Sequence, residues 1–147
     1  MKEINPRAET MAHIKRVGDL LIQAAKELLN RAMAHDASKL LEPEAPLFEA
    51  HTAKLAALTY DGPEYREALK NSKELGPAIE HHWANNTHHP EHWENGVNDM
   101  DLYDVLEMLN DWKAASERQN NGNIMTSLEK NRTRFKLSDQ LYVILKN

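Results

Sequence analysis

The chain has 147 residues, a formal net charge of −5 and no cysteine. This length fits a single domain, residues 1–147, with a hydrophobic core of its own. The lack of cysteine excludes disulfides, thiolate zinc sites and thiol nucleophiles. The acidic balance does not favour nucleic acid or an anionic membrane as a partner. No signal-peptide core or apolar run of about 20 residues stands out, so we expect a cytoplasmic protein without a membrane segment.

Helix-forming residues dominate and glycine is scarce, which predicts an all-α fold, a single bundle of about six to seven helices. Asn5 and Pro6 are typical of a helix start, and the apolar residues that follow recur at intervals of three and four. We predict a first helix over residues 6–29. Asn30 is expected to break it, and a short second helix then runs through Ala34 and ends near Lys39.

Proline and glycine mark the boundaries in the middle of the chain. Residues 46–59 are rich in alanine and leucine and are predicted to be helical. A turn precedes Pro63, where the next helix is expected to start, and another helix opens at Pro77. That helix must end at or before Pro90, because the residue before a proline avoids the helical conformation.

The last third of the chain predicts three more helices. The first covers residues 99–118 and is capped at residues 98–99. Its apolar side chains are Leu102, Val105, Leu106, Leu109 and Trp112. Thr126 and Glu129 fit a capping box that opens a polar helix, and Ser138 caps a final apolar one.

The stretch AHDASK is the first candidate for chemistry. It contains His35 and Asp36, with Lys39 three residues after the aspartate. Neighbouring residues on a helix point about 100° apart, so His35 and Asp36 can bind one ion only if it lies at the edge of the helix between them. Taken alone, the dipeptide is explained more simply by a polar helix end that faces water. Lys39 also suits the negative end of a helix dipole.

Other metal-ligand side chains lie on the predicted helices 6–29 and 99–118. His13 lies on or beside the apolar stripe of the first. Asp104, Glu107 and Asp111 share one face of the second, close to its apolar face, where a carboxylate is costly unless it is paired or binds metal. A solvated acidic stripe is the alternative. We prefer it for Glu107, whereas the spacing leaves both interpretations open for Asp111.

Five of the eight histidines lie within residues 81–92. Helical spacing places His82, Asn85 and His89 on one face, and His81, Asn85 and His88 on a neighbouring face. Ligand, substrate-contact and surface roles all stay open for them. We favour His82 as an additional ligand or phosphate contact, with the others near the substrate. A separate structural zinc site is disfavoured, since such sites usually close with four ligands, often cysteine. Its ligands would be His88, His89 and His92.

Three further groups have ordinary structural explanations. We expect His51 to be a satisfied histidine of its helix rather than a ligand. The tryptophans are expected in the core and in pocket walls; they are Trp83, Trp93 and Trp112. A basic cluster is expected to form a solvated face rather than a phosphate contact, and comprises Lys130, Arg132 and Arg134.

In chain order, His13, AHDASK, EHHWANN and MLNDWKAAS resemble the HD-domain superfamily of metal-dependent phosphohydrolases. The resemblance implies a metal bound by His13, His35, Asp36 and Asp111. It selects Asp111 over Asp104, and leaves His82 and Asp104 as additional ligands. It further implies catalytic roles for Asp36, Lys39 and His82. The substrate contacts that we expect are Lys39, His81, Asn85, His88 and His89.

A narrower resemblance covers most of residues 10–145. The motifs HDASKLLEPE, HHWANNTHHPEHW, MDLYDVLEMLNDWKAA and RFKLSDQL are similar to a small family of phage and bacterial proteins. A phage-encoded member would act in the host cytoplasm. One departure from the superfamily pattern is Ser38, which stands where a smaller residue, often glycine, precedes the lysine. This departure does not change the expected ligands, but the shape of the loop after Asp36 stays open.

Two imidazoles and two carboxylates leave an octahedral ion two positions for water or phosphate oxygens. Imidazole suits Mn, Co, Fe, Ni or Zn better than Mg, and such an ion lowers the pKa of bound water from 15.7 towards about 7. We therefore predict hydrolysis of a small phosphorylated substrate, a nucleoside mono- or triphosphate by analogy. The alternatives are an HD-type diiron oxygenase and a non-catalytic phage-type binding protein. The superfamily resemblance also allows a homodimer.

Overall fold

The computed structural model describes residues 5–56, 58, 62–71, 75–118 and 122–147. Over these residues the chain forms seven α-helices and three short 3-10 helices, with no strand, which confirms the predicted all-α fold. The chain divides into two compact units, Met1–His35 and Asp36–Asn147. The single domain over residues 1–147 stays a prediction.

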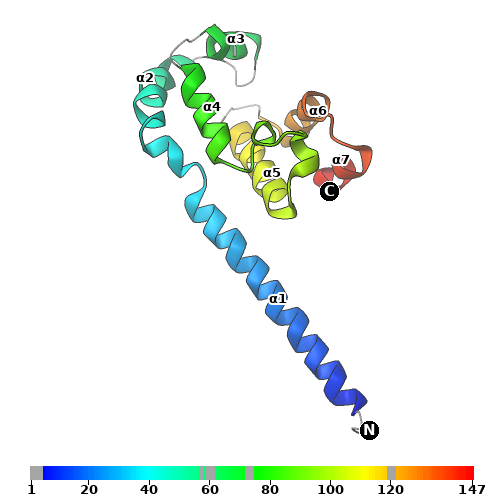
Figure 1. Ribbon diagram of the computed structural model, residues 1–147. Helices are drawn as coiled ribbons and strands as arrows, with labels where there is room; N and C mark the ends of the chain where they lie inside the picture. The colour runs from blue at the N-terminus through cyan, green and yellow to red at the C-terminus, as the bar shows by residue number, and fades with distance from the viewer. Residues whose placement is uncertain (1–4, 57, 59–61, 72–74, 119–121) are drawn as a thin grey trace. The chain divides into compact units, whose positions relative to one another are not determined.

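The first unit is one uninterrupted helix, α1 (Pro6–Ala34) (Figure 1). The Asn5 side chain caps it by accepting hydrogen bonds from two backbone N–H groups, and Pro6 occupies the first turn, as predicted. The predicted break at Asn30 is wrong. Asparagine costs only a few tenths of a kcal/mol inside a helix, so the helix continues until His35 caps its C-terminal end.

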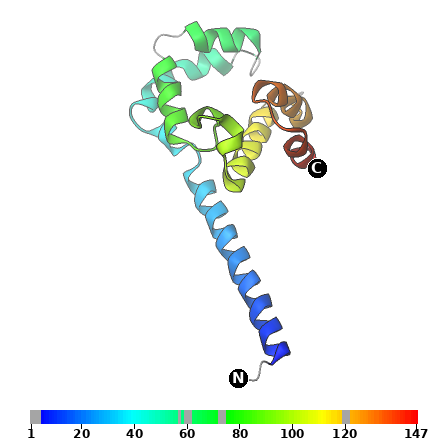
Figure 2. The same ribbon diagram turned by 45° about the vertical axis from the view of Figure 1, so that its right-hand side comes forward.

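The second unit begins with Asp36 in the left-handed conformation, at φ 55° and ψ 16°. This backbone conformation prevents the predicted helix over residues 34–39, and a 3-10 helix, Ala37–Leu40, follows instead. Then come α2 (Glu44–Ala56), α3 (Pro63–Asn71) and α4 (Leu75–Asn85). Both views show α2 beside α4, and these two helices pack together (Figures 1 and 2).

The predicted starts of these helices need small corrections. Helix α2 begins at Glu44, two residues earlier than expected, and its predicted end lies outside the described residues. Helix α3 starts at Pro63 as predicted. Pro77 lies in the first turn of α4, where a proline is tolerated because no backbone N–H is needed there.

Helix α4 ends at Asn85, five residues before Pro90 and thus within the predicted limit. A turn carries the chain to two 3-10 helices, Pro90–His92 and Gly96–Asp99. His88 and His89 therefore lie in the turn after α4. The helical faces predicted for them do not exist, although the turn still brings both close to His82.

Helices α5 (Leu102–Glu117), α6 (Ile124–Arg134) and α7 (Asp139–Lys146) follow. Asp101 caps α5 in a capping box, so the predicted cap at residues 98–99 is wrong. Asn123 caps α6 in place of the predicted box at Thr126. Ser138 caps α7 as predicted, by accepting a hydrogen bond from the Leu141 N–H.

The described core of the second unit lies where α5, α6 and α7 meet. Its buried residues are Val97, Met108, Trp112, Leu128, Leu137 and Tyr142. Leu102 and Leu106, counted in the predicted apolar stripe of α5, are 85% and 41% exposed, so α5 buries a face rotated from that stripe. In the described part of the chain, no helix is long and apolar enough to cross a membrane.

Candidate metal centre

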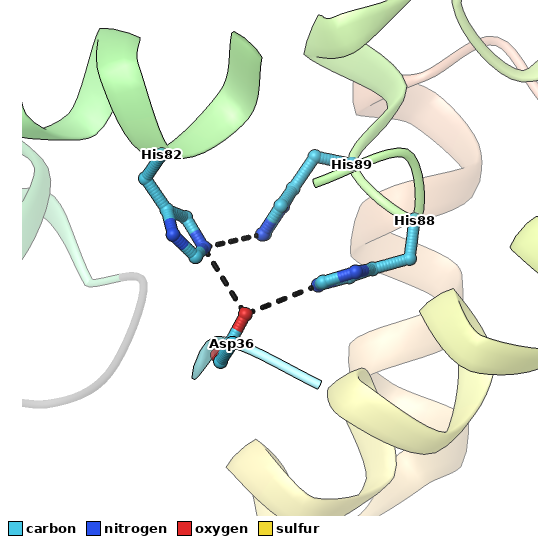
Figure 3. A group of neighbouring side chains, drawn as sticks. All are labelled: Asp36, His82, His88 and His89. Atoms are coloured by element: carbon cyan, nitrogen blue, oxygen red, sulfur yellow. Dashed lines mark hydrogen bonds and ion pairs between the residues drawn. The ribbon is translucent and has the colours of Figure 1, made fainter. Parts of the chain in front are cut away.

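Asp36 and three histidines converge within the second unit (Figure 3). One ligand atom from each of Asp36, His82, His88 and His89 lies within 4.8 Å of every other. Asp36 Oδ1 is 3.2 Å from His82 Nε2 and 3.4 Å from His88 Nε2. The two Nε2 atoms of His82 and His89 are 2.9 Å apart. These four side chains, the Asp36 cluster, could hold a metal ion.

The spacing of the donor atoms fits one ion. Ligand atoms about 2.1 Å from a metal lie about 3.0 Å apart at right angles and about 3.4 Å apart in a tetrahedron. The three separations, 2.9, 3.2 and 3.4 Å, fall in this range. Three imidazole nitrogens and one carboxylate oxygen suit a transition metal better than Mg²⁺ or Ca²⁺.

Three local structures present these ligands. His82 projects from the last turn of α4 and is buried. His88 and His89 follow in the turn before Pro90, which starts a 3-10 helix with His89 as its cap. Asp36 reaches them from its left-handed position, a conformation that aspartate adopts more readily than most residues. The non-helical backbone at residues 36 and 86–89 thus positions the ligand atoms.

A carboxylate lies behind each of two ligand histidines. Glu44, which has 0% exposure, has its Oε2 atom 2.9 Å from His82 Nδ1. Glu107 on α5 lies 3.2 Å from His88 Nδ1. A neutral imidazole carries one N–H, so it cannot donate to this carboxylate and to Asp36 at once. A cation at the Nε2 atoms satisfies Asp36 and both histidines together.

The charges of the cluster also suit a metal. Burial raises the pKa of Asp36, but the neighbouring His82 and His88 rings and the positive charge of Lys39 outweigh it, and the pKa lies well below its usual range. Burial lowers the pKa of His89 to about 3, helped by the neighbouring His88 and His82. His89 is therefore neutral near pH 7, and Asp36 is ionised, which is the state that metal ligands need.

Lys39 lies beside the cluster. Its Nζ is 2.6 Å from Asp36 Oδ2, the oxygen that does not face the histidines, and 5.6 Å from the centre of the Phe48 ring. The side chain is 38% exposed. The ammonium group therefore reaches both the carboxylate and solvent, and its predicted contact with substrate stays a prediction.

The predicted metal set is only partly brought together. Asp111 on α5 offers a carboxylate oxygen within 4.8 Å of one on Asp36, and its charge only partly offsets the lowering of the His89 pKa by burial and by His88 and His82. His13 lies exposed in the middle of α1. It stands 22 positions before His35 on one continuous helix, about 33 Å away. The prediction that both imidazoles of one chain bind the same ion is therefore wrong, and the role of His35 itself stays a prediction.

Two acidic residues of α5 differ from expectation. Asp104 is buried and accepts hydrogen bonds from the Asp101 N–H at 3.0 Å and from Thr87 Oγ1 at 2.6 Å. It closes the capping box of α5 and belongs to no ligand group among the described residues. Glu107 was expected on a solvated stripe, yet it pairs with His88 because α5 turns this face towards the cluster.

Other members of the histidine-rich segment have neighbours of their own. His81 Nδ1 is 2.7 Å from Glu44 Oε1, and Asn85 Nδ2 donates to the His81 carbonyl at 2.8 Å. Their substrate contacts stay predictions. His92 Nδ1 donates to the Trp83 carbonyl at 2.9 Å, which explains its place without the structural zinc considered above. His51 Nδ1 is 2.8 Å from the Leu47 carbonyl, as expected for a satisfied histidine.

The tryptophans and the basic cluster have structural contacts. Trp112 is buried in the core and stacks on Phe135, and Trp93 Nε1 donates to the Thr87 carbonyl at 2.8 Å. Trp83 is half-buried. Two ion pairs hold the arginines of α6, each with an N···O distance of 2.8 Å: Arg132–Asp139 and Arg134–Glu91. Lys130 is exposed.

Sequence reasoning overlooked Glu44 and treated Ser38 only as a departure from a family pattern. Ser38 Oγ donates to Glu44 Oε2 at 3.0 Å and accepts from Asn86 Nδ2 at 2.9 Å. The only available signal was Glu44 itself, an acidic residue at a helix start. That position has an ordinary explanation in the helix dipole, so burial was not foreseeable.

Comparison with known proteins identifies a family. Its model, described as "Family of unknown function (DUF5662)", matches residues 2–147. The chain therefore belongs to DUF5662. No curated protein and no solved structure matches the chain.

Proposed function

We propose that this member of DUF5662 is a metal-dependent phosphohydrolase. Its substrate class is a small phosphorylated molecule, with nucleoside mono- and triphosphates as the first candidates. The observation that carries the proposal is the convergence of Asp36, His82, His88 and His89, whose ligand atoms lie within 4.8 Å of one another. The resemblance of AHDASK and the later motifs to the HD-domain superfamily supports the choice of reaction.

The proposed metal is a divalent transition ion, Mn, Co, Fe, Ni or Zn. A bound ion of this kind polarises a phosphoryl oxygen and lowers the pKa of water towards about 7. Asp36 Oδ1 and the three Nε2 atoms are the proposed ligands. This set keeps Asp36 and puts His82, His88 and His89 in place of the other three ligands expected from the sequence; all four residues lie in one unit of the chain.

The remaining residues near the cluster supply charge and proton transfer. Lys39, 2.6 Å from Asp36 Oδ2, is placed to contact a phosphate oxygen as a point charge. In this proposal the Asp111 carboxylate accepts a proton from the attacking water. The water oxygen bonds to phosphorus as the P–O bond to the leaving group breaks, and the leaving oxygen takes up the proton that Asp111 accepted.

The test is phosphate release from a panel of nucleotides and simple phosphoesters, with Mn, Co, Ni, Zn and Mg added separately. Turnover should require a transition ion and should vanish in Asp36→Asn, while the surface control Asp139→Asn stays active. Oxygen consumption with Fe(II), and no phosphate release, would support the oxygenase instead. No turnover under any condition, with a tight partner recovered, would support a binding protein.

A further inference from the structure

Glu44 is a fully buried residue beside the Asp36 cluster. The side chain has 0% exposure and lies in the first turn of α2. Each of its two oxygens has a separate partner from α4: Oε1 faces His81 Nδ1 at 2.7 Å, and Oε2 faces His82 Nδ1 at 2.9 Å. Because both oxygens are engaged from one helix, the carboxylate cannot rotate without losing a contact.

The neighbouring donors assign the hydrogen on His82. Asn86 Nδ2 donates to Ser38 Oγ at 2.9 Å and to the His82 carbonyl at 2.7 Å. Its two hydrogens are then used, so it has none for His82 Nδ1, although it lies 3.1 Å from that atom. Ser38 gives its hydroxyl hydrogen to Glu44. The consistent arrangement is His82 Nδ1–H donating to Glu44, which leaves Nε2 with a lone pair directed at the cluster.

From this network we infer that Glu44 is the positioning residue of the metal centre: it fixes the tautomer and ring orientation of His82, and His81 and Ser38 fix Glu44. A carboxylate behind a metal-binding histidine typically contributes 10- to 100-fold to metal affinity. Glu107 lies in the same relation to His88, but at 3.2 Å and with 15% of its side chain exposed. Its contribution is the smaller of the two.

The inference rests on the proposed metal site and not on the reaction. It is tested with the full chain and with Zn²⁺ and Co²⁺ as probes. Glu44→Gln keeps the volume of the side chain but leaves one acceptor oxygen for two imidazole donors. The matched control is Glu49→Gln, which changes an exposed glutamate of the same helix.

The first measurement is ¹⁵N NMR of the histidine side chains in metal-free protein, which reports the tautomer of each ring. Wild type and Glu49→Gln should hold His82 with hydrogen on Nδ1, and Glu44→Gln should lose this preference. The second measurement is the affinity for Zn²⁺, determined by titration calorimetry. Glu44→Gln should bind Zn²⁺ 10- to 100-fold more weakly at unchanged stoichiometry, with an altered visible spectrum of the Co²⁺ form.

If Glu44→Gln does not fold, Glu44→Asp takes its place in the test, because aspartate keeps the carboxylate on a side chain that is one methylene shorter. It should restore part of the affinity. A folded Glu44 variant with the wild-type tautomer and affinity would overturn the inference. If wild type itself bound no metal, the proposed function would fail, while the NMR comparison would still decide whether Glu44 sets the tautomer.

Discussion

Asp36 has a left-handed backbone conformation and supplies the only carboxylate of the Asp36 cluster. Its φ of 55° is tolerated by asparagine about as well as by aspartate, whereas alanine would be strained there. Asp36→Asn therefore removes the charge without disturbing the turn. This makes it a sharper test of the metal site than Asp36→Ala.

We expect Asp36→Asn to abolish stoichiometric metal binding while the far-ultraviolet circular dichroism stays that of wild type. The reason is that the one anionic ligand of the cluster is lost, and neutral amides are poor ligands for transition ions. Metal content after purification without added metal measures this directly. Asp139→Asn, at an exposed position of α7, should bind as wild type does. Equal metal content in both variants would remove Asp36 from the site.

At the scale of helices, the fold followed largely from the sequence because caps and periodicity are local signals. Asn5 with Pro6, Pro63 and Ser138 marked helix starts that the structure has. The break at Asn30 failed because the weak preference of one asparagine is overridden by its neighbours. The turn after α4 was unforeseen since no glycine marks it, and that turn decides which histidines become ligands.

The site was predicted less completely than the helices, for a physical reason. Asp36 and His82 were identifiable by residue type and motif. The pairings of Glu44 with His82 and of Glu107 with His88 join residues 38 and 19 positions apart. Such contacts depend on how α2 and α5 pack against the segment from α4 to the following turn, and no local pattern encodes that packing.

The N-terminal cap of α5 gives a test at this scale. Asp101 accepts hydrogen bonds of 2.8 Å from the N–H groups of Tyr103 and Asp104. Asp101→Ala should lower the free energy of unfolding by about 0.5–2 kcal/mol, the usual value of such a cap. Urea denaturation measures the loss. Lys113→Ala, at an exposed position of the same helix, serves as a comparison, and an equal loss there would argue against a specific cap.

The contact between α6 and α7 predicts a dependence on alkaline pH. Tyr142 donates a hydrogen bond to Glu129, and this bond raises the pKa of the tyrosine above its ordinary value of 10.0. A raised pKa means that the stabilisation is complete below pH 10 and is lost as pH rises through the folded-state value. Wild type should therefore lose more stability than Tyr142→Phe between about pH 9 and pH 12. An equal loss of stability in wild type and Tyr142→Phe across this range, measured by urea denaturation, would contradict the role given to this hydrogen bond.

For the whole molecule, an ion in the Asp36 cluster would act as a link between distant parts of the chain. It would join residue 36 to residues 82–89, all in the second unit. Binding to the folded state alone stabilises it by about 2.7 kcal/mol when free metal is a hundredfold above Kd. For a chain of this size that corresponds to a rise in Tm of about 5–10 °C.

Calorimetric scans with Zn²⁺ or Mn²⁺, and after chelation, should show this rise in wild type and in Asp139→Asn. Asp36→Asn should show none. A shift of equal size in Asp36→Asn would mean that the ion stabilises the protein from another place.

The left-handed turn at Asp36 also limits which residues can occupy that position over generations. The backbone admits chiefly glycine, asparagine and aspartate, and position 36 must supply the one anionic ligand of the cluster, because its other three ligands are imidazoles. Only aspartate meets both requirements. In a library of all twenty residues scored separately for folding and for metal uptake, position 36 should therefore give a narrow set of folded variants and a single functional one. His89, in ordinary extended backbone at φ −90°, should fold with many substitutions and lose only the metal.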